Sequence, residues 1–149
     1  MRQGRRGRVA VIIGSSDEHE GMEDMSDLVD LSDLPFMEVW GEEVRARRLE
    51  GERITLAVVE LAPGAIVPEH RHAQEQLGIC VRGSVRFRVG EEVRDLGPGG
   101  TWRVPPDLPH EVVAGPQGAI AIDVFSPIRS DWDFPTLEPR PPLWPPSQG

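Results

Sequence analysis

Short segments with the alternation of a β-strand recur along the middle of the chain, and glycine or proline closes each of them. Ile54, Leu56 and Val58 alternate with polar or small residues, and residues 85–89 repeat the pattern after a turn expected at Gly83. Further turns are expected at residues 97–100, 105–109 and 115–118. No amphipathic helix is evident here. The pattern therefore predicts an all-β sandwich or barrel, most economically a two-sheet jelly roll.

The length and composition predict one domain with a tail at each end. A chain of 149 residues with 38% hydrophobic residues can bury one modest core. We expect a disordered acidic extension over 1–33, because residues 15–33 hold eight carboxylates and no arginine. The barrel should span 34–130. A proline-rich tail should follow over 131–149, either disordered or packed loosely on its own domain.

The charge and the single cysteine limit the partners and the compartment. A net charge of −9 argues against binding to nucleic acid or to an anionic membrane, because both need a basic face. No run approaches the roughly 18 apolar residues of a membrane-spanning helix. Cys80 has no second cysteine to pair with, so a reducing compartment, the cytoplasm, is expected.

Three of the four histidines fall in the β-rich region. His70 and His72 are two residues apart, so on an extended chain both imidazoles face the same side, and Gln76 has the same parity. His110 follows a proline-rich turn and opens a later strand. An isolated pair of this kind is more often a surface or hydrogen-bonded pair. Four ligand-capable groups beside turns favour a site for one divalent metal. His19, in the acidic stretch, is expected to be solvated.

The spacing of these residues resembles two motifs of the cupin family. Residues 64–83 read Gly-x5-His-x-His-x3-Gln-x6-Gly, like the first motif, and Gly97-Pro98-Gly99 with Pro105 and His110 is similar to the second. The resemblance covers about residues 40–130 and implies a double-stranded β-helix barrel. Cupins usually have glutamate where Gln76 stands, and Glu75 should face the opposite side.

Glutamine changes what the metal is expected to do. Three imidazoles and an amide leave the double charge of the ion uncompensated, so it should act as a Lewis acid and bind anions well. Iron that activates oxygen more often has a carboxylate ligand. Zinc, nickel, manganese and iron all remain open.

A second constellation lies in a later strand. Ile120, Ile122 and Val124 share one face, which places Asp123 and Phe125 on the other. If that face is the barrel interior, burial would raise the pKa of Asp123 and suit it to proton transfer. A solvated face, or a structural pair with an arginine, explains the pattern equally well.

The segment Asp-x-Phe-Ser-Pro-x-Arg resembles the small cupins of pectin and alginate catabolism. Those cupins convert 4,5-unsaturated uronate monosaccharides to linear keto sugars. The resemblance implies that Asp123 moves a proton, that Arg129 holds the substrate carboxylate and that Phe125 shapes the pocket wall. The expected partner is thus a small anionic substrate, and Trp102 is a candidate to line its site.

Two other functions stay open. A cupin polyketide cyclase would need a wide apolar cavity, whereas a uronate enzyme needs a small polar cavity containing Arg129. A non-enzymatic metal- or sugar-binding cupin would be supported by an attached DNA-binding helix pair or a second cupin repeat, and the sequence has neither. We also expect a homodimer, since such barrels often pair through edge strands.

Overall fold

The structure is a computed structural model that describes residues 26–147. Within these residues, one 3-10 helix, η1 (Leu31–Asp33), precedes eight strands. They are β1 (Phe36–Glu38), β2 (Val44–Glu50), β3 (Thr55–Leu61), β4 (Ile66–His70), β5 (Glu75–Val89), β6 (Glu92–Leu96), β7 (Thr101–Val104) and β8 (His110–Ser126). The predicted all-β jelly-roll class is confirmed, and every strand in the described part of the chain lies within residues 34–130. None of the described residues belongs to a helix long and apolar enough to cross a membrane.

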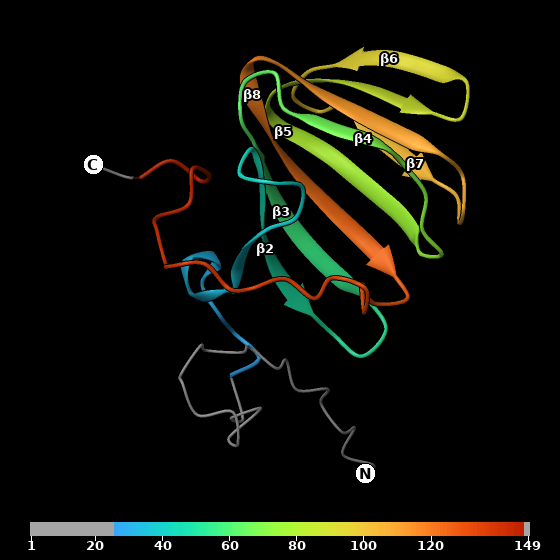
Figure 1. Cartoon of the computed structure of the whole chain (residues 1–149). Coiled ribbons are helices and arrows are strands. Elements are labelled where there is room, and N and C mark those ends of the chain that lie inside the picture. The colour runs from blue at the N-terminus through green and yellow to red at the C-terminus, as the bar shows by residue number, and fades with distance from the viewer. Residues whose placement is uncertain (1–25, 148–149) are drawn as a thin grey trace.

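The two long strands, β5 and β8, organise a single antiparallel sheet that rolls on itself (Figure 1). The sheet order is β1-β2-β3-β8-β5-β6, while β4 adds to β8 and β7 adds to β5. The first half of β8 pairs with β4, and its second half pairs with β3. β5 and β8 run antiparallel, so the start of each strand pairs with the end of the other. Gln76 near the start of β5 and His110 at the start of β8 nevertheless line the same interior cavity.

The long strands bend where the sequence predicts turns. Residues around Gly83 and 115–118 do not reverse the chain but interrupt the pairing of β5 with β8. Gly83 has a φ of 74°, and a Cβ there would overlap the carbonyl of Gly118. The glycine therefore allows the bend and the close approach of the two backbones. The turns predicted at Gly83 and 115–118 are therefore bulges within strands, whereas those predicted at 97–100 and 105–109 separate β6 from β7 and β7 from β8.

Alternating residues of most strands fill the interior, while β6 has no buried residue. The core cluster contains Val44, Val59, Val85, Phe87 and Ala121, among others, all buried. Asp123 and Phe125 lie on this inner face, which settles the orientation of the second constellation. Cys80 is fully buried in the same core, as expected for a small apolar residue.

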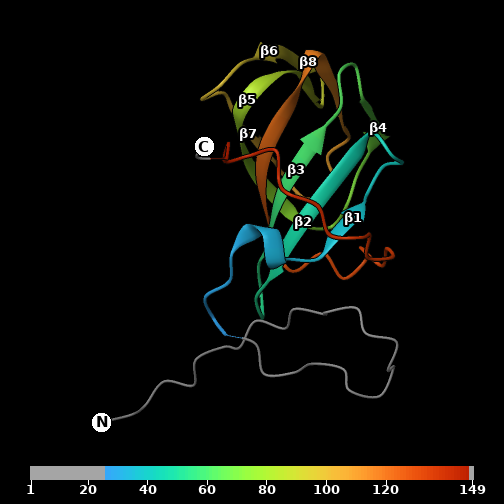
Figure 2. The same cartoon turned by 90° about the vertical axis from the view of Figure 1, so that its left-hand side faces the viewer.

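Up to residue 147, the proline-rich segment after β8 has no regular helix or strand, but it is packed on the outside of the barrel (Figure 2). The N–H of Leu137 donates to the carbonyl of Phe36 at 2.7 Å. A buried ion pair between Arg47 Nη1 and Glu60 Oε2, 2.7 Å apart, also binds this segment. Arg47 Nη2 donates to the Arg140 carbonyl and Glu60 accepts from the Leu143 N–H. Of the two expectations for this tail, packing on its own domain is the observed one, and it is closer than a loose association.

The expected acidic extension lies mostly outside the described residues, as does His19. Of residues 26–33, Val29 and Leu31 are partly buried and the others are exposed.

Candidate metal centre

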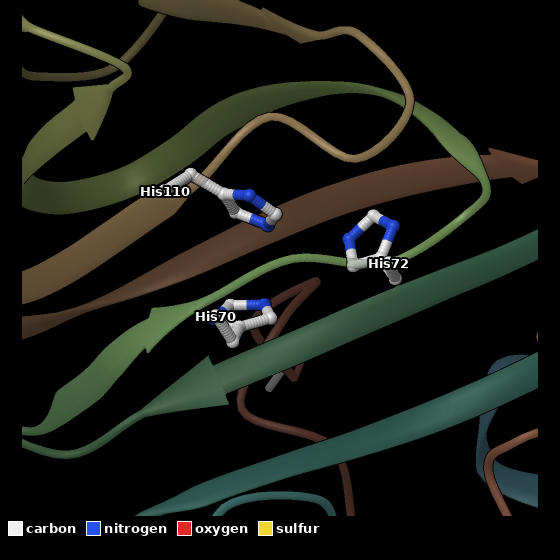
Figure 3. A group of neighbouring side chains, drawn as sticks. All are labelled: His70, His72 and His110. Carbon is white, nitrogen blue, oxygen red and sulfur yellow. The ribbon is translucent and has the colours of Figure 1, made fainter.

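Three histidine side chains meet at one end of the barrel interior (Figure 3). His70 ends β4 and His110 begins β8, and the two are direct partners in the sheet. His72 follows in the turn before β5, where its carbonyl accepts the N–H of Asp107 at 2.8 Å. The candidate ligand atoms all lie within 4.8 Å of one another. This is the grouping that the His-x-His spacing and the later His110 predicted.

Each of the three rings is oriented by a backbone carbonyl. Nδ1 of His70 lies 2.8 Å from the Pro68 carbonyl oxygen, and Nδ1 of His72 lies 2.9 Å from that of Gln74. Nδ1 of His110 is 2.9 Å from the carbonyl oxygen of Leu108. A neutral imidazole has one N–H, so donation from Nδ1 leaves the Nε2 lone pair free to bind a metal.

The environment keeps these imidazoles neutral. Burial, partly opposed by the hydrogen bond to Pro68, lowers the pKa of His70. Burial also lowers the pKa of His72, with the charge of Arg129 adding to the effect. The pKa of His110 falls to about 4, again chiefly through burial. Neutral imidazole is the form that binds a metal, so no proton has to leave at neutral pH.

The donor atoms fit a cation. Nε2 of His110 is buried without a hydrogen-bond partner among the described residues. Nε2 of His72 lies 3.1 Å from Oε1 of Gln76. With the His72 proton on Nδ1, both atoms of that contact are acceptors, and a shared cation would satisfy them. The three-histidine group can therefore hold a metal ion, and Gln76 offers a fourth, neutral donor.

Gln76 links the histidines to Asp123. It is buried near the start of β5, and its Nε2 donates to Oδ1 of Asp123 at 2.8 Å. This hydrogen bond assigns the amide orientation and directs Oε1 toward His72. Glu75 is exposed on the opposite face, as its parity predicts.

Asp123 is a buried carboxyl group with two donors on one oxygen. Besides Gln76, Nε1 of Trp102 donates to Oδ1 at 2.7 Å. Burial raises the pKa of Asp123 to about 6, while these hydrogen bonds and the charge of Arg129 oppose the rise. Both protonation states are therefore accessible near neutral pH, as proton transfer requires.

Gly78 makes the contact between Trp102 and Asp123 possible. In the sheet, Gly78 pairs with Trp102 of β7 on one side and with Asp123 of β8 on the other. A Cβ at this position would overlap Nε1 of Trp102 and Oδ1 of Asp123. Sequence reasoning missed this role, although a glycine inside a strand pattern is a signal of close approach.

Arg129 lies just beyond β8 and is buried. Its guanidinium carbon is 4.7 Å from the ring centroids of both Phe125 and Trp132. Nε and Nη2 donate to the two carboxylate oxygens of Asp131, at 3.0 and 2.9 Å. One edge of the guanidinium is thus engaged, while Nη1 is not part of this pair. Neither Asp131 nor Trp132 was identified from the sequence.

A cavity of about 60 Å³ joins the two constellations. Its lining includes His70, Gln76, His110, Asp123 and Arg129, together with apolar residues from the barrel core. Trp102 and Phe125 also line it.

Trp40, which the sequence did not single out, contributes to the same lining from the β1–β2 connection. Its side chain is 38% exposed, and its ring centroid lies 4.9 Å from that of His70. An aromatic ring therefore borders the histidine group on its accessible side.

The comparisons with known proteins agree on the family. Residues 57–125 match the family model described as a cupin domain. The chain is 31% identical over 80 residues to the pectin degradation protein KdgF of Dickeya dadantii (strain 3937), covering 53% of this chain and 73% of that protein. It is 32% identical over 92 residues to oxalate decarboxylase OxdC of Bacillus subtilis (strain 168), covering 58% of this chain but only 24% of that protein.

Solved structures give the same result. An RmlC-like cupin from Shewanella frigidimarina NCIMB 400 superposes with a TM-score of 0.65 at 26% identity, covering 72% of this chain and 96% of that one. KdgF from a Halomonas species superposes with a TM-score of 0.60 at 26% identity, covering 64% and 88%. Fold, donor set and sequence similarity together place this chain in the cupin superfamily, where it resembles KdgF.

Proposed function

We propose that the protein is a metal-dependent enzyme that converts 4,5-unsaturated uronate monosaccharides to their linear keto forms. The observation that carries the proposal is that one small cavity is lined by Asp123, Arg129 and two members of the three-histidine group, His70 and His110. The similarity to KdgF, a pectin degradation protein, supports the same substrate class.

The metal centre would consist of His70, His72, His110 and Gln76, and zinc, nickel, manganese or iron would suit these ligands. A divalent ion held by neutral ligands supplies a Lewis acid that stabilises negative charge on substrate oxygen. The chemistry required of the protein is then proton movement and orientation of the sugar.

Asp123 would move the proton between oxygen and carbon. Gln76 and Trp102 both hold Oδ1, so Oδ2 is the oxygen left to exchange the proton. A pKa of about 6 lets the carboxyl group accept and return a proton near neutral pH.

Arg129 would bind the substrate carboxylate. Its Nε side is occupied by Asp131, so the carboxylate would be met by the end of the guanidinium that carries Nη1. Phe125 would form the wall between the histidine group and this arginine, because its ring packs against His72 and under the guanidinium.

The cavity favours this function over the polyketide cyclase alternative. A folded polyketide needs a wide apolar chamber. This cavity is lined mostly by apolar residues and so is less polar than the uronate function predicts, but its volume of about 60 Å³ and the presence of Arg129 fit a small anionic molecule better.

The experiment is to incubate metal-loaded protein with unsaturated monouronates and to follow the loss of their ultraviolet absorbance. The wild type should accelerate the loss, while Asp123→Asn and His110→Ala should lower the rate by at least about 100-fold. Asp133→Asn, which removes an exposed charge outside the cavity, is the matched control. No acceleration by metal-loaded wild type, or turnover of oxalate in its place, would refute the proposal.

A further inference from the structure

Gln74 connects the histidine group to Arg129 although it belongs to neither. It lies in the turn between β4 and β5 and is 7% exposed. Its carbonyl accepts the Nδ1–H of His72 at 2.9 Å. Its side-chain Nε2 donates to the Ile128 carbonyl at 3.0 Å and to Oδ1 of Asp131 at 3.2 Å. A buried amide thus spans two segments that are more than 50 residues apart in the sequence.

Asp131 completes the connection. The oxygen that accepts from Gln74 also accepts from Nε of Arg129, and the second oxygen accepts from Nη2. The pair is asymmetric in exposure, because the Arg129 side chain is 7% exposed and that of Asp131 is 52% exposed. The carboxylate therefore orients a buried cation from the solvent side.

Two further contacts hold the guanidinium in place. Phe125 and Trp132 lie against it, each with its ring centroid 4.7 Å from the guanidinium carbon. These cation–π contacts fix the position of the guanidinium carbon, and the bidentate bond to Asp131 fixes the orientation of the group. The end of the guanidinium that carries Nη1 therefore points in one defined direction.

We propose that Gln74 and Asp131 are positioning residues that hold Arg129 at a fixed place relative to the metal centre, so that a ligand carboxylate and the metal are engaged together. The uronate as the ligand rests on the proposed function. A site that binds a ligand at two points selects that ligand only if the distance and direction between the two points are fixed.

Binding measurements test the inference without turnover. The zinc-loaded protein is titrated with glucuronate and with glucose by calorimetry, and the preference for glucuronate is the readout. Wild type should prefer glucuronate, and Asp131→Asn should reduce this preference by about tenfold, because an amide hydrogen then faces Nη2. Asp133→Asn makes the same change of charge two residues away and should keep the preference.

Gln74→Ala separates positioning from metal binding. Its backbone carbonyl still orients His72, so zinc affinity should stay within about threefold of wild type while the glucuronate preference falls. This variant also keeps the inference testable if Asp131→Asn fails to fold.

Three results would overturn the inference. They are an unchanged preference in both variants, an equal loss of glucose and glucuronate binding, and a wild type without any preference. If wild type prefers glucuronate and Asp131→Asn loses the preference, but no unsaturated uronate is consumed, the proposed reaction fails and the positioning role stands.

Discussion

Replacement of Asp123 by asparagine should make the metal-free protein more stable at neutral pH. The carboxyl group is 7% exposed, and burial raises its pKa from an ordinary 3.8 to about 6. A raised carboxyl pKa means that the folded state favours the neutral acid. Its contribution to stability is complete below pH 3.8 and is lost as pH rises through about 6.

The magnitude follows from that interval. The pKa rises from 3.8 to about 6, and each unit corresponds to about 1.4 kcal/mol. The free energy of unfolding therefore falls by about 3 kcal/mol when Asp123 ionises. Asparagine keeps an oxygen for Gln76 and Trp102 and has no charge to bury. The Asp123→Asn variant should therefore match wild type near pH 4 and exceed it by up to about 3 kcal/mol at pH 7.5.

Urea unfolding of both proteins at a series of pH values, with a chelator present, measures the difference. Comparing two variants cancels the titration of every other group. A difference that does not change with pH, or an asparagine variant that is less stable at pH 7.5, would refute the reasoning about the buried carboxyl group.

Three further predictions concern the packing and the metal. Gly78→Ala should separate Trp102 from Asp123 and lower turnover of the uronate by at least about tenfold, which steady-state kinetics checks. Zinc at 100 times its dissociation constant should stabilise the fold by about 2.7 kcal/mol and raise the melting temperature by roughly 5–10 °C in calorimetry, a shift that His110→Ala should abolish. Glu60→Gln should leave Arg47 buried without its counter-charge and cost about 3 kcal/mol in urea unfolding.

Much of the fold and of the metal site could be predicted from the alternation of residues along the strands. Period-two patterning placed Asp123 and Phe125 on one face. The same rule predicted that His70 and His72 lie together, and they do, although His72 lies beyond the end of β4 in the turn before β5. What parity cannot decide is whether a glycine reverses a strand or only bends it. The local sequence around Gly83 is compatible with either a reversal or a bend, and the pairing of β5 with β8 produces the bend.

The contacts that orient the site residues could not be predicted from the sequence, for a different reason. Gln74 and Asp131 are separated by 57 residues, and each has an ordinary surface-like neighbourhood in the sequence. Only the sheet brings their turns together. The role of Gly78 likewise depends on which residues lie opposite it in β7 and β8.

The proline-rich segment illustrates the limit of composition as a predictor. Proline prevents regular structure there, as expected, but backbone groups of the segment form hydrogen bonds with Phe36 and with the Arg47–Glu60 pair. Trp132, at the start of this segment, packs against Arg129. The segment therefore contributes to the site and does not only follow the domain.

The central claim is a metal held by His70, His72, His110 and Gln76, and X-ray absorption on protein loaded with one equivalent of zinc tests it most directly. We expect three imidazole nitrogens and at least one oxygen at about 2.0–2.2 Å, with tight binding lost in His110→Ala. Failure to retain zinc through gel filtration, or an unchanged spectrum in His110→Ala, would contradict the account.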